Sequence, residues 1–150
     1  MPRSRCWRNA GASARPMSPS ARWRAYLTGT LRDVSAFDAK DIRRAMPRFA
    51  PATYAANLAL LEPYAAMAQQ AGCTQAQLAL AWLLAKAEHV VRIPGTVNPA
   101  HLAENLGAAT VQLAPEVMAQ LDALFQPQAI HGPRYNAQNQ AEIDTEDFPA

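Results

Sequence analysis

The chain has 150 residues and a formal net charge of +2, and 50% of its residues are apolar. Thirty-three of these apolar residues are alanine, so the larger side chains suffice for one modest core and not for two. A charged fraction of 17% argues against wholesale disorder, and the apolar runs are too short for a membrane span. Two cysteines form no disulfide framework, which favours a reducing, cytoplasmic location.

Charge is divided unevenly along the chain. Residues 1–50 hold 11 of the 14 Lys and Arg residues and 3 of the 12 acids, whereas residues 51–150 hold 3 bases and 9 acids. Residues 1–25 are rich in Arg, Ser and Pro, lack acids and have no apolar period. They are compatible with a basic arm for nucleic acid, a transit peptide, or a leader that is disordered or non-native. We favour the leader, because prolines interrupt any amphipathic helix and nothing downstream resembles a nucleic-acid-binding fold.

Helical periodicity begins in the acidic part of the chain. Residues 26–52 are predicted to be loop, with a short helical turn near 38–45. Over 53–71, apolar residues recur every three or four positions, as on one face of a helix. Pro63 predicts a kink or a break in this helix, and Gly72 predicts its end.

The next helix and the strand after it have clear local signals. Thr74 and Gln77 have the spacing of a capping box, which places a helix start at this point. Residues 78–87 are apolar on nearly all sides, so this helix is expected to be buried on most faces. The sequence VVRIP, residues 90–94, is short, β-branched and apolar, which predicts a buried strand.

Two further helices and a tail are predicted after the strand. Asn98 and Pro99 suit the N-cap and first position of a helix, in which Leu102 and Leu106 are expected to face the core. Another helix is predicted over 115–125, followed by a polar, aperiodic tail. One strand alone makes no sheet, and a buried strand between helices implies parallel neighbours. We therefore expect the chain to be the end of something larger.

The turn between the strand and its following helix is the candidate site. A helix N-terminus presents unpaired N–H groups and the positive end of the helix dipole, which suits an anion. Gly95 allows a close backbone approach, and Thr96 adds a hydroxyl. Asn98, His101 and Asn105 share one helix face, so the set can hold a phosphate beside an adenine and ribose. The alternative is an ordinary helix–strand–helix turn that binds nothing.

Several motifs together resemble a known family. The sequence IPGTVNPAHLAENLGAA, residues 93–109, resembles the cofactor-binding signature near the C-terminus of the aldo-keto reductases. CTQAQLALAWLL, residues 73–84, resembles the helix that precedes it in that family. LTGTLRD, DIRRAMPRF and GPRYN also match the family branch in which this region follows the seventh barrel strand. The resemblance covers roughly residues 26–148.

The resemblance implies an α/β fold: the C-terminal fragment of a (β/α)8 TIM barrel, mostly helical as it stands, with VVRIP as the eighth strand. The expected organisation is a leader over 1–25, a partial barrel over 26–126 and a C-terminal tail over 127–150. Two departures stand out. Arg92 occupies a position where the family usually has proline, and Ser18–Pro19 remain where the seventh strand and its glycines do not.

The resemblance also implies a cofactor, the adenosine phosphate half of NADPH. Thr96 and Asn98 would face the 2′-phosphate, and Glu104 and Asn105 the adenine amino group. His101 stands where many members have arginine, a stronger phosphate partner, so NADH stays open as an alternative. The expected cofactor-binding residues are Ile93, Gly95, Thr96, Asn98, His101, Glu104 and Asn105, with no metal site.

The catalytic machinery is the main departure from the family. The reductases use Asp, Tyr, Lys and His from the N-terminal half of the barrel, where the tyrosine protonates the carbonyl oxygen as hydride leaves the nicotinamide. No residue here matches those motifs, and a full barrel needs about 250 residues. We expect an NADP-dependent oxidoreductase of small carbonyl substrates by family, with this chain inactive alone. The alternative is a non-catalytic helical remnant or interaction module.

Overall fold

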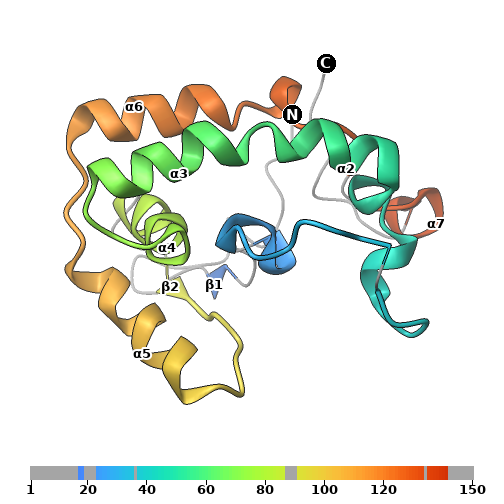
Figure 1. Cartoon of the computed structure of the whole chain (residues 1–150), viewed down its shortest axis with the longest axis horizontal. Coiled ribbons are helices and arrows are strands. Elements are labelled where there is room, and N and C mark those ends of the chain that lie inside the picture. The colour runs from blue at the N-terminus through green and yellow to red at the C-terminus, as the bar shows by residue number, and fades with distance from the viewer. Residues whose placement is uncertain (1–16, 19–22, 36, 87–90, 134, 142–150) are drawn as a thin grey trace.

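The computed structural model describes residues 17–18, 23–35, 37–86, 91–133 and 135–141. Most of this part of the chain is helical. In Figure 1, α6 runs beside α3 and α4 packs against α3, and this group encloses the core. Its helices are α2 (Pro51–Leu58), α3 (Leu61–Gln70), α4 (Gln75–Lys86) and α6 (Pro115–Leu124). None of the described helices is long and apolar enough to cross a bilayer.

The long apolar period over 53–71 is split into two helices, as Pro63 predicts. α2 ends at Leu58 and α3 begins at Leu61, so Pro63 lies in the first turn of α3, where its missing N–H has no intrahelical role. Gly72 adopts a φ of +63° after α3, and its N–H donates to the Gln69 carbonyl at 3.1 Å. The prediction that Gly72 ends the helix is confirmed.

The predicted capping box at the start of α4 is also confirmed. The Gln77 N–H donates to Thr74 Oγ1 at 3.1 Å, and the Thr74 N–H donates to Gln77 Oε1 at 3.1 Å. These two bonds satisfy donors that the first turn would otherwise leave unpaired. α4 then buries Ala76, Leu78, Ala79, Leu80 and Ala81, in agreement with its predicted burial.

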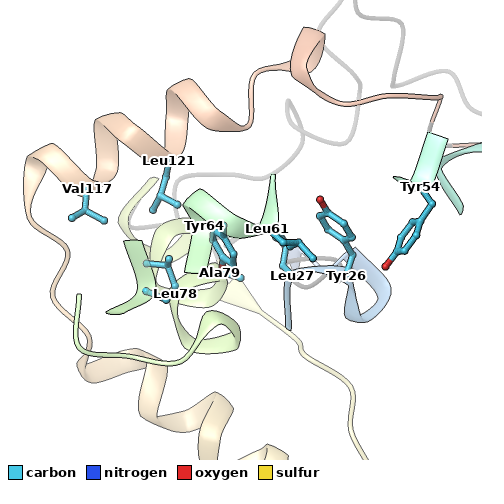
Figure 2. Packing of buried hydrophobic residues seen from close by; sticks show 10 residues of the cluster. Tyr26, Leu27, Tyr54, Leu61, Tyr64, Leu78, Ala79, Val117 and Leu121 are labelled. Carbon is cyan, nitrogen blue, oxygen red and sulfur yellow. The ribbon is translucent and has the colours of Figure 1, made fainter. Parts of the chain in front are cut away.

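The core is built around three buried tyrosines and the leucines that contact them (Figure 2). Each tyrosine hydroxyl donates to a backbone carbonyl, as burial of a phenol requires. Tyr26 donates to Asn57, Tyr54 to Leu31 at 2.7 Å, and Tyr64 to Gln75 at 2.6 Å. The remaining fully packed side chains are Leu27, Leu61, Ala68, Leu78, Ala79, Val117 and Leu121.

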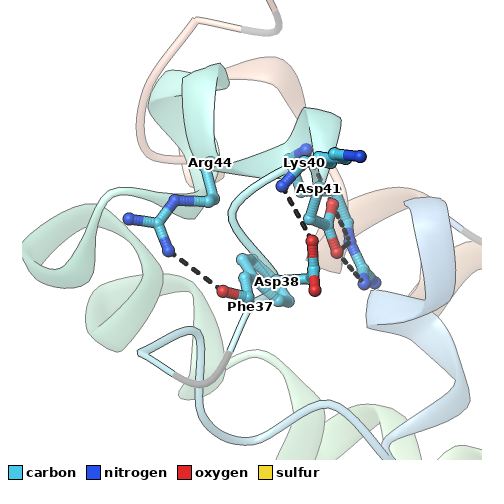
Figure 3. A network of polar contacts seen from close by, with 6 residues as sticks. Phe37, Asp38, Lys40, Asp41 and Arg44 are labelled. Atoms are coloured by element: carbon cyan, nitrogen blue, oxygen red, sulfur yellow. Dashed lines mark hydrogen bonds and ion pairs between the residues drawn. The ribbon is translucent and has the colours of Figure 1, made fainter.

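Short 3-10 helices connect these elements. Asp41 caps one of them by accepting the Arg43 N–H at 2.9 Å, and its carboxylate also pairs with the Arg43 guanidinium. Figure 3 shows this network, in which Arg44 Nη1 donates to the Phe37 carbonyl at 3.0 Å. The helical turn predicted near 38–45 is thus present. The 3-10 helices are η1 (Trp23–Thr28), η2 (Ile42–Ala45), η3 (Pro47–Phe49), η4 (Ala108–Thr110) and η5 (Pro127–Ala129).

The C-terminal tail is docked onto α2. The Asn57 side chain accepts the His131 N–H at 2.9 Å and donates to the His131 carbonyl at 3.0 Å. Arg48 Nε donates to the Gly132 carbonyl at 2.9 Å. A short helix, α7 (Ala137–Ala141), follows. The sequence shows no period in this region, because long-range bonds to single backbone groups leave no pattern along the chain.

The strand pair corrects the expectation of a lone strand. β2 (Val91–Arg92) lies within the predicted VVRIP strand and pairs in parallel with β1 (Met17–Ser18), with Met17 opposite Val91. β1 falls inside residues 1–25, for which no structure was expected. Two residues are too few to give a periodic signal, so the sequence did not predict this strand. After β2 the chain enters α5 (Pro99–Gly107), which contacts α4.

Candidate functional site

All seven predicted cofactor-binding residues lie on one continuous segment, from the end of β2 through α5. Asn98 is the N-cap of α5, and its Oδ1 accepts the Ala100 N–H at 2.9 Å. Thr96 Oγ1 accepts the Asn98 N–H at 3.1 Å, so the two side chains expected to face a phosphate stabilise the same turn. The predicted N-cap and the proline at the first helical position are both confirmed.

The turn is an open rim with the chemistry of an anion site. Gly95, Asn98 and His101 are exposed, and Thr96 is half-buried. The positive end of the α5 dipole points at this rim, which favours a negatively charged ligand. The N–H groups of Asn98 and Ala100 already donate to side-chain oxygens, so an anion gains these two donors by replacing those oxygens.

Glu104 and Asn105 lie at the contact between α5 and α4. Glu104 Oε1 accepts the Thr74 hydroxyl at 2.8 Å, and Gln77 Nε2 donates to the Glu104 carbonyl at 3.2 Å. Asn105 is 7% exposed. Contact is close because the helix ends at Gly107, where a Cβ would lie 2.7 Å from Gln77 Nε2. In this arrangement both side chains contribute to helix packing, whereas the turn at Thr96 is accessible.

The structure contradicts the predicted orientation of the apolar side of α5. Leu102 is 50% exposed, Leu106 is 67% exposed, and the neighbouring Val97 is fully exposed. Asn105 and Ala108 face inward in their place. The close approach to Gln77 fixes this rotation, because it turns the Asn105 side of α5 toward α4. Leu102 and Leu106 therefore have no core to enter within the described residues.

Arg92 is the last residue of β2 and directly precedes this segment. Its Nη1 donates to the Leu80 carbonyl of α4. Nε and Nη2 are closed off from solvent and have no hydrogen-bond partner among the described residues. Burial lowers the pKa of Arg92 to about 10, because the charged guanidinium loses hydration that this single bond does not replace.

Three of the described tyrosines, Tyr26, Tyr54 and Tyr64, are buried residues of the core. Burial raises the pKa of Tyr54 to about 12 and raises the pKa of Tyr64 and of Tyr26 further still. Their hydroxyls are bound to backbone carbonyls, and their rings pack with Phe49 and Phe125. Tyr54 and Tyr64 therefore act as core residues.

A groove away from this segment is lined by α2, α3 and one arginine. It has a volume of about 510 Å³, and none of the seven predicted residues contributes to it. No sequence motif pointed to it. Its lining residues are Arg32, Leu58, Ala59, Leu61, Glu62, Ala65, Ala66 and Gln69.

Comparison with known proteins shows the family of this chain. A model of the aldo/keto reductase family matches residues 16–126. The chain belongs to the aldo-keto reductase family. It is 30% identical over 142 residues to the aldo-keto reductase str7 of Strobilurus tenacellus, an alignment that covers 95% of this chain and 42% of that protein. The family is one of (β/α)8 barrels, and its members typically bind a nicotinamide cofactor.

The match also revises where the resemblance begins. It starts at residue 16, ahead of the predicted start at 26, and so includes β1. The alignment to the Strobilurus protein leaves only 8 of the 150 residues outside, so it reaches into the arginine-rich segment. The expectation that no strand remains at Ser18 is wrong, because β1 ends at this residue and pairs in parallel with β2.

Proposed function

We propose that this chain carries the adenosine-phosphate end of the cofactor site of an NADPH-dependent carbonyl reductase. One observation carries the proposal: in a chain of this family, β2 leads through the exposed Gly95 and the half-buried Thr96 into the capped N-terminus of α5. The proposed location is cytoplasmic, which rests on the low cysteine content. The proposed substrate is a small carbonyl compound.

The proposed organisation is a partial barrel followed by a tail. The barrel portion ends near residue 126, the tail spans 127–150, and the pairing of β1 supports an earlier start than residue 26. The chain spans 42% of the length of its Strobilurus relative. We expect carbonyl reduction only when the other strands complete the barrel, and no turnover by these 150 residues alone.

The residues of the turn have distinct proposed roles. Thr96 and Asn98 would hold the 2′-phosphate at the N-terminus of α5, and Gly95 would let the ribose approach the backbone beside Ile93. His101 is exposed on the first turn, where an imidazole N–H can donate to the phosphate. Bound NADPH supplies the hydride, and the chain's own part is to bind and orient the nucleotide.

Glu104 and Asn105 are the less accessible members of the proposed site. The Thr74 hydroxyl already donates to Glu104 Oε1, which leaves Oε2 of the carboxylate to accept from an adenine amino group. Asn105 has to become more exposed than its present 7%. Asn105 would therefore engage the adenine only after α5 shifts relative to α4.

A second candidate, a non-catalytic interaction module, is supported by one observation. The apolar side of α5 is exposed, and large exposed apolar patches mark binding surfaces for other polypeptides. In this case the chain would bind a partner and show no preference between nucleotides.

Calorimetric titration with NADPH and NADH tests the cofactor proposal. The full chain is expected to bind NADPH with a Kd no weaker than about 1 mM. Asn98→Asp keeps the helix cap but adds a negative charge beside the proposed 2′-phosphate, so it should weaken NADPH binding at least about tenfold. Asn136→Asp is the matched control, because Asn136 Oδ1 accepts the Asn139 N–H at 2.8 Å near α7 in a comparable cap. Equal NADPH affinities of the two variants would contradict the site.

A turnover assay tests the proposed inactivity. The purified chain is mixed with NADPH and a simple aldehyde, and cofactor absorbance is followed over time. No loss above background is expected. Steady turnover would show that the 150 residues contain a complete catalytic centre and would refute the proposal.

A further inference from the structure

One hydrogen-bond network joins the start of α4 to Glu104 on α5. The two helices are in contact (Figure 1). Thr74 Oγ1 donates to Glu104 Oε1 at 2.8 Å, and Gln77 Nε2 donates to the Glu104 carbonyl at 3.2 Å. The network therefore fixes both the side chain and the backbone of Glu104 relative to α4.

The two donors of this network, Thr74 and Gln77, are also the capping box of α4. Thr74 Oγ1 accepts the Gln77 N–H, and Gln77 Oε1 accepts the Thr74 N–H, each at 3.1 Å. A capping box needs only acceptor atoms from its two side chains. The hydroxyl proton of Thr74 and the side-chain NH2 of Gln77 stay available as donors, and both are used on Glu104. The contacts with α5 are therefore additional to helix capping.

The network leaves one oxygen of the Glu104 carboxylate open. Glu104 is half-buried, and among the described residues no hydrogen bond reaches its Oε2. A glutamate side chain has several rotamers in solution, so the bond from Thr74 selects one of them before a ligand binds. Glu104 follows His101 by three residues, which makes the two side chains neighbours along α5. The open oxygen thus belongs to the same helix surface as the proposed phosphate-binding turn.

We propose that Thr74 and Gln77 are positioning residues that hold Glu104 for the amino group of adenine, and that they thereby set the preference of the site for this base. This inference rests on the proposed function, because it takes the β2–α5 segment as the nucleotide site. The amino group of adenine donates to the open oxygen of Glu104. A base with a carbonyl oxygen at the same position has no proton to donate there and is disfavoured beside a carboxylate.

Titration calorimetry with NADPH and its deamino analogue tests the positioning role. The analogue has hypoxanthine in place of adenine and the same charge, so effects of charge alone cancel in the ratio of the two affinities. Thr74→Ser keeps the hydroxyl and should keep the preference for NADPH. Thr74→Asp keeps a capping oxygen but has no proton to donate to Glu104, so the preference should fall about fivefold, as for one lost hydrogen bond. Circular dichroism should show both variants folded, because both residues cap helices well.

Two further variants separate positioning from helix stability. Gln77→Glu still completes a capping box but cannot donate to the Glu104 carbonyl, so it should also lower the preference for NADPH. In the Glu104→Ala background, Thr74→Asp should leave the ratio of affinities unchanged, because its effect passes through Glu104. An unchanged ratio in Thr74→Asp or in Gln77→Glu, or an equal weakening of both nucleotides, would overturn the proposal.

The same titrations separate this inference from the proposed function. If Asn98→Asp weakens NADPH binding while Thr74→Asp leaves the ratio unchanged, the nucleotide site stands and the positioning role is refuted. If the unsubstituted chain binds both nucleotides equally well, the positioning role is refuted as well. If it binds neither nucleotide, both proposals are refuted.

Discussion

The helical core and the β2–α5 edge differ in how far their apolar side chains are buried and their polar groups are hydrogen-bonded. In the core, Tyr64, Leu78 and Leu121 are fully enclosed, and every buried tyrosine hydroxyl has a carbonyl partner. At the edge, Leu106 faces outward and Arg92 keeps two nitrogens without partners in the described residues. The contrast shows that the core is largely stabilised by contacts within the chain, whereas the edge keeps apolar and polar groups that the described residues do not cover.

Truncation of one leucine in each region is expected to give the largest difference between the core and the edge. Leu78→Ala removes a side chain with no exposed surface, so it should lower the free energy of unfolding by about 2–5 kcal/mol. Leu102→Ala, at a half-exposed position, should change it by no more than about 0.5 kcal/mol. Urea unfolding followed by circular dichroism measures both. Equal losses would show that α5 packs its apolar side after all.

The next prediction tests whether the C-terminal tail, which Asn57 holds against α2, contributes to stability. Asn57→Asp keeps the shape of the side chain but replaces the amide donor to the His131 carbonyl with an acceptor. Asn57 is 2% exposed, so the lost bond should lower stability by about 1–3 kcal/mol. The melting temperature reports the change. Asn139→Asp, at an exposed position of α7, is the control and should have little effect.

At the edge, the lowered pKa of Arg92 predicts how stability depends on pH. Its folded-state pKa of about 10 lies below that of a free arginine, so the unfolded chain binds the proton more tightly. The charged group therefore lowers stability below that pKa, and the penalty falls as pH rises through about 10.

Substitution of Arg92 tests that penalty directly. Arg92→Met keeps the apolar stem and should raise stability by about 1 kcal/mol at pH 7, a value that allows for partial exposure. The change is measured by urea unfolding of the isolated chain. Arg32→Met, at an exposed guanidinium, should be neutral. A loss of stability in Arg92→Met would mean that the Leu80 bond outweighs the desolvation of the charge.

The smallest expected effect concerns the link between α4 and α6. Asp122 accepts the Trp82 indole N–H at 2.7 Å and pairs with Lys86. The bond from Lys86, and to a lesser degree that from Trp82, lowers the pKa of Asp122, so the stabilisation is present at neutral pH and lost as pH falls through the folded-state pKa. Because the group is exposed, Asp122→Asn should cost no more than about 0.5 kcal/mol at pH 7 and nothing near pH 2. A difference that does not change with pH would refute an ionic contribution.

Local signals predicted the structure where they act within a few residues. The capping box at Thr74, the cap at Asn98 and the break near Pro63 depend on contacts between chain neighbours, and all are present. The rotation of α5 did not follow, because it is fixed by Gln77 and Gly107 across two helices. β1 was not predicted either, since two residues are too few to show the alternation of apolar and polar residues typical of a strand. The seven cofactor-binding residues stay a prediction from the motif, and their unequal accessibility is visible only from the packing of α5.

Hydrogen exchange of the full chain with and without NADPH is the most direct test of the central claim, that the β2–α5 edge is a nucleotide-binding rim. Mass spectrometry of peptic fragments should show slower exchange in the segment that contains Thr96 and Asn98, and unchanged exchange in α3 and α6. NADH should protect it less. Protection confined to the groove that α2, α3 and Arg32 line, or no protection anywhere, would contradict the account.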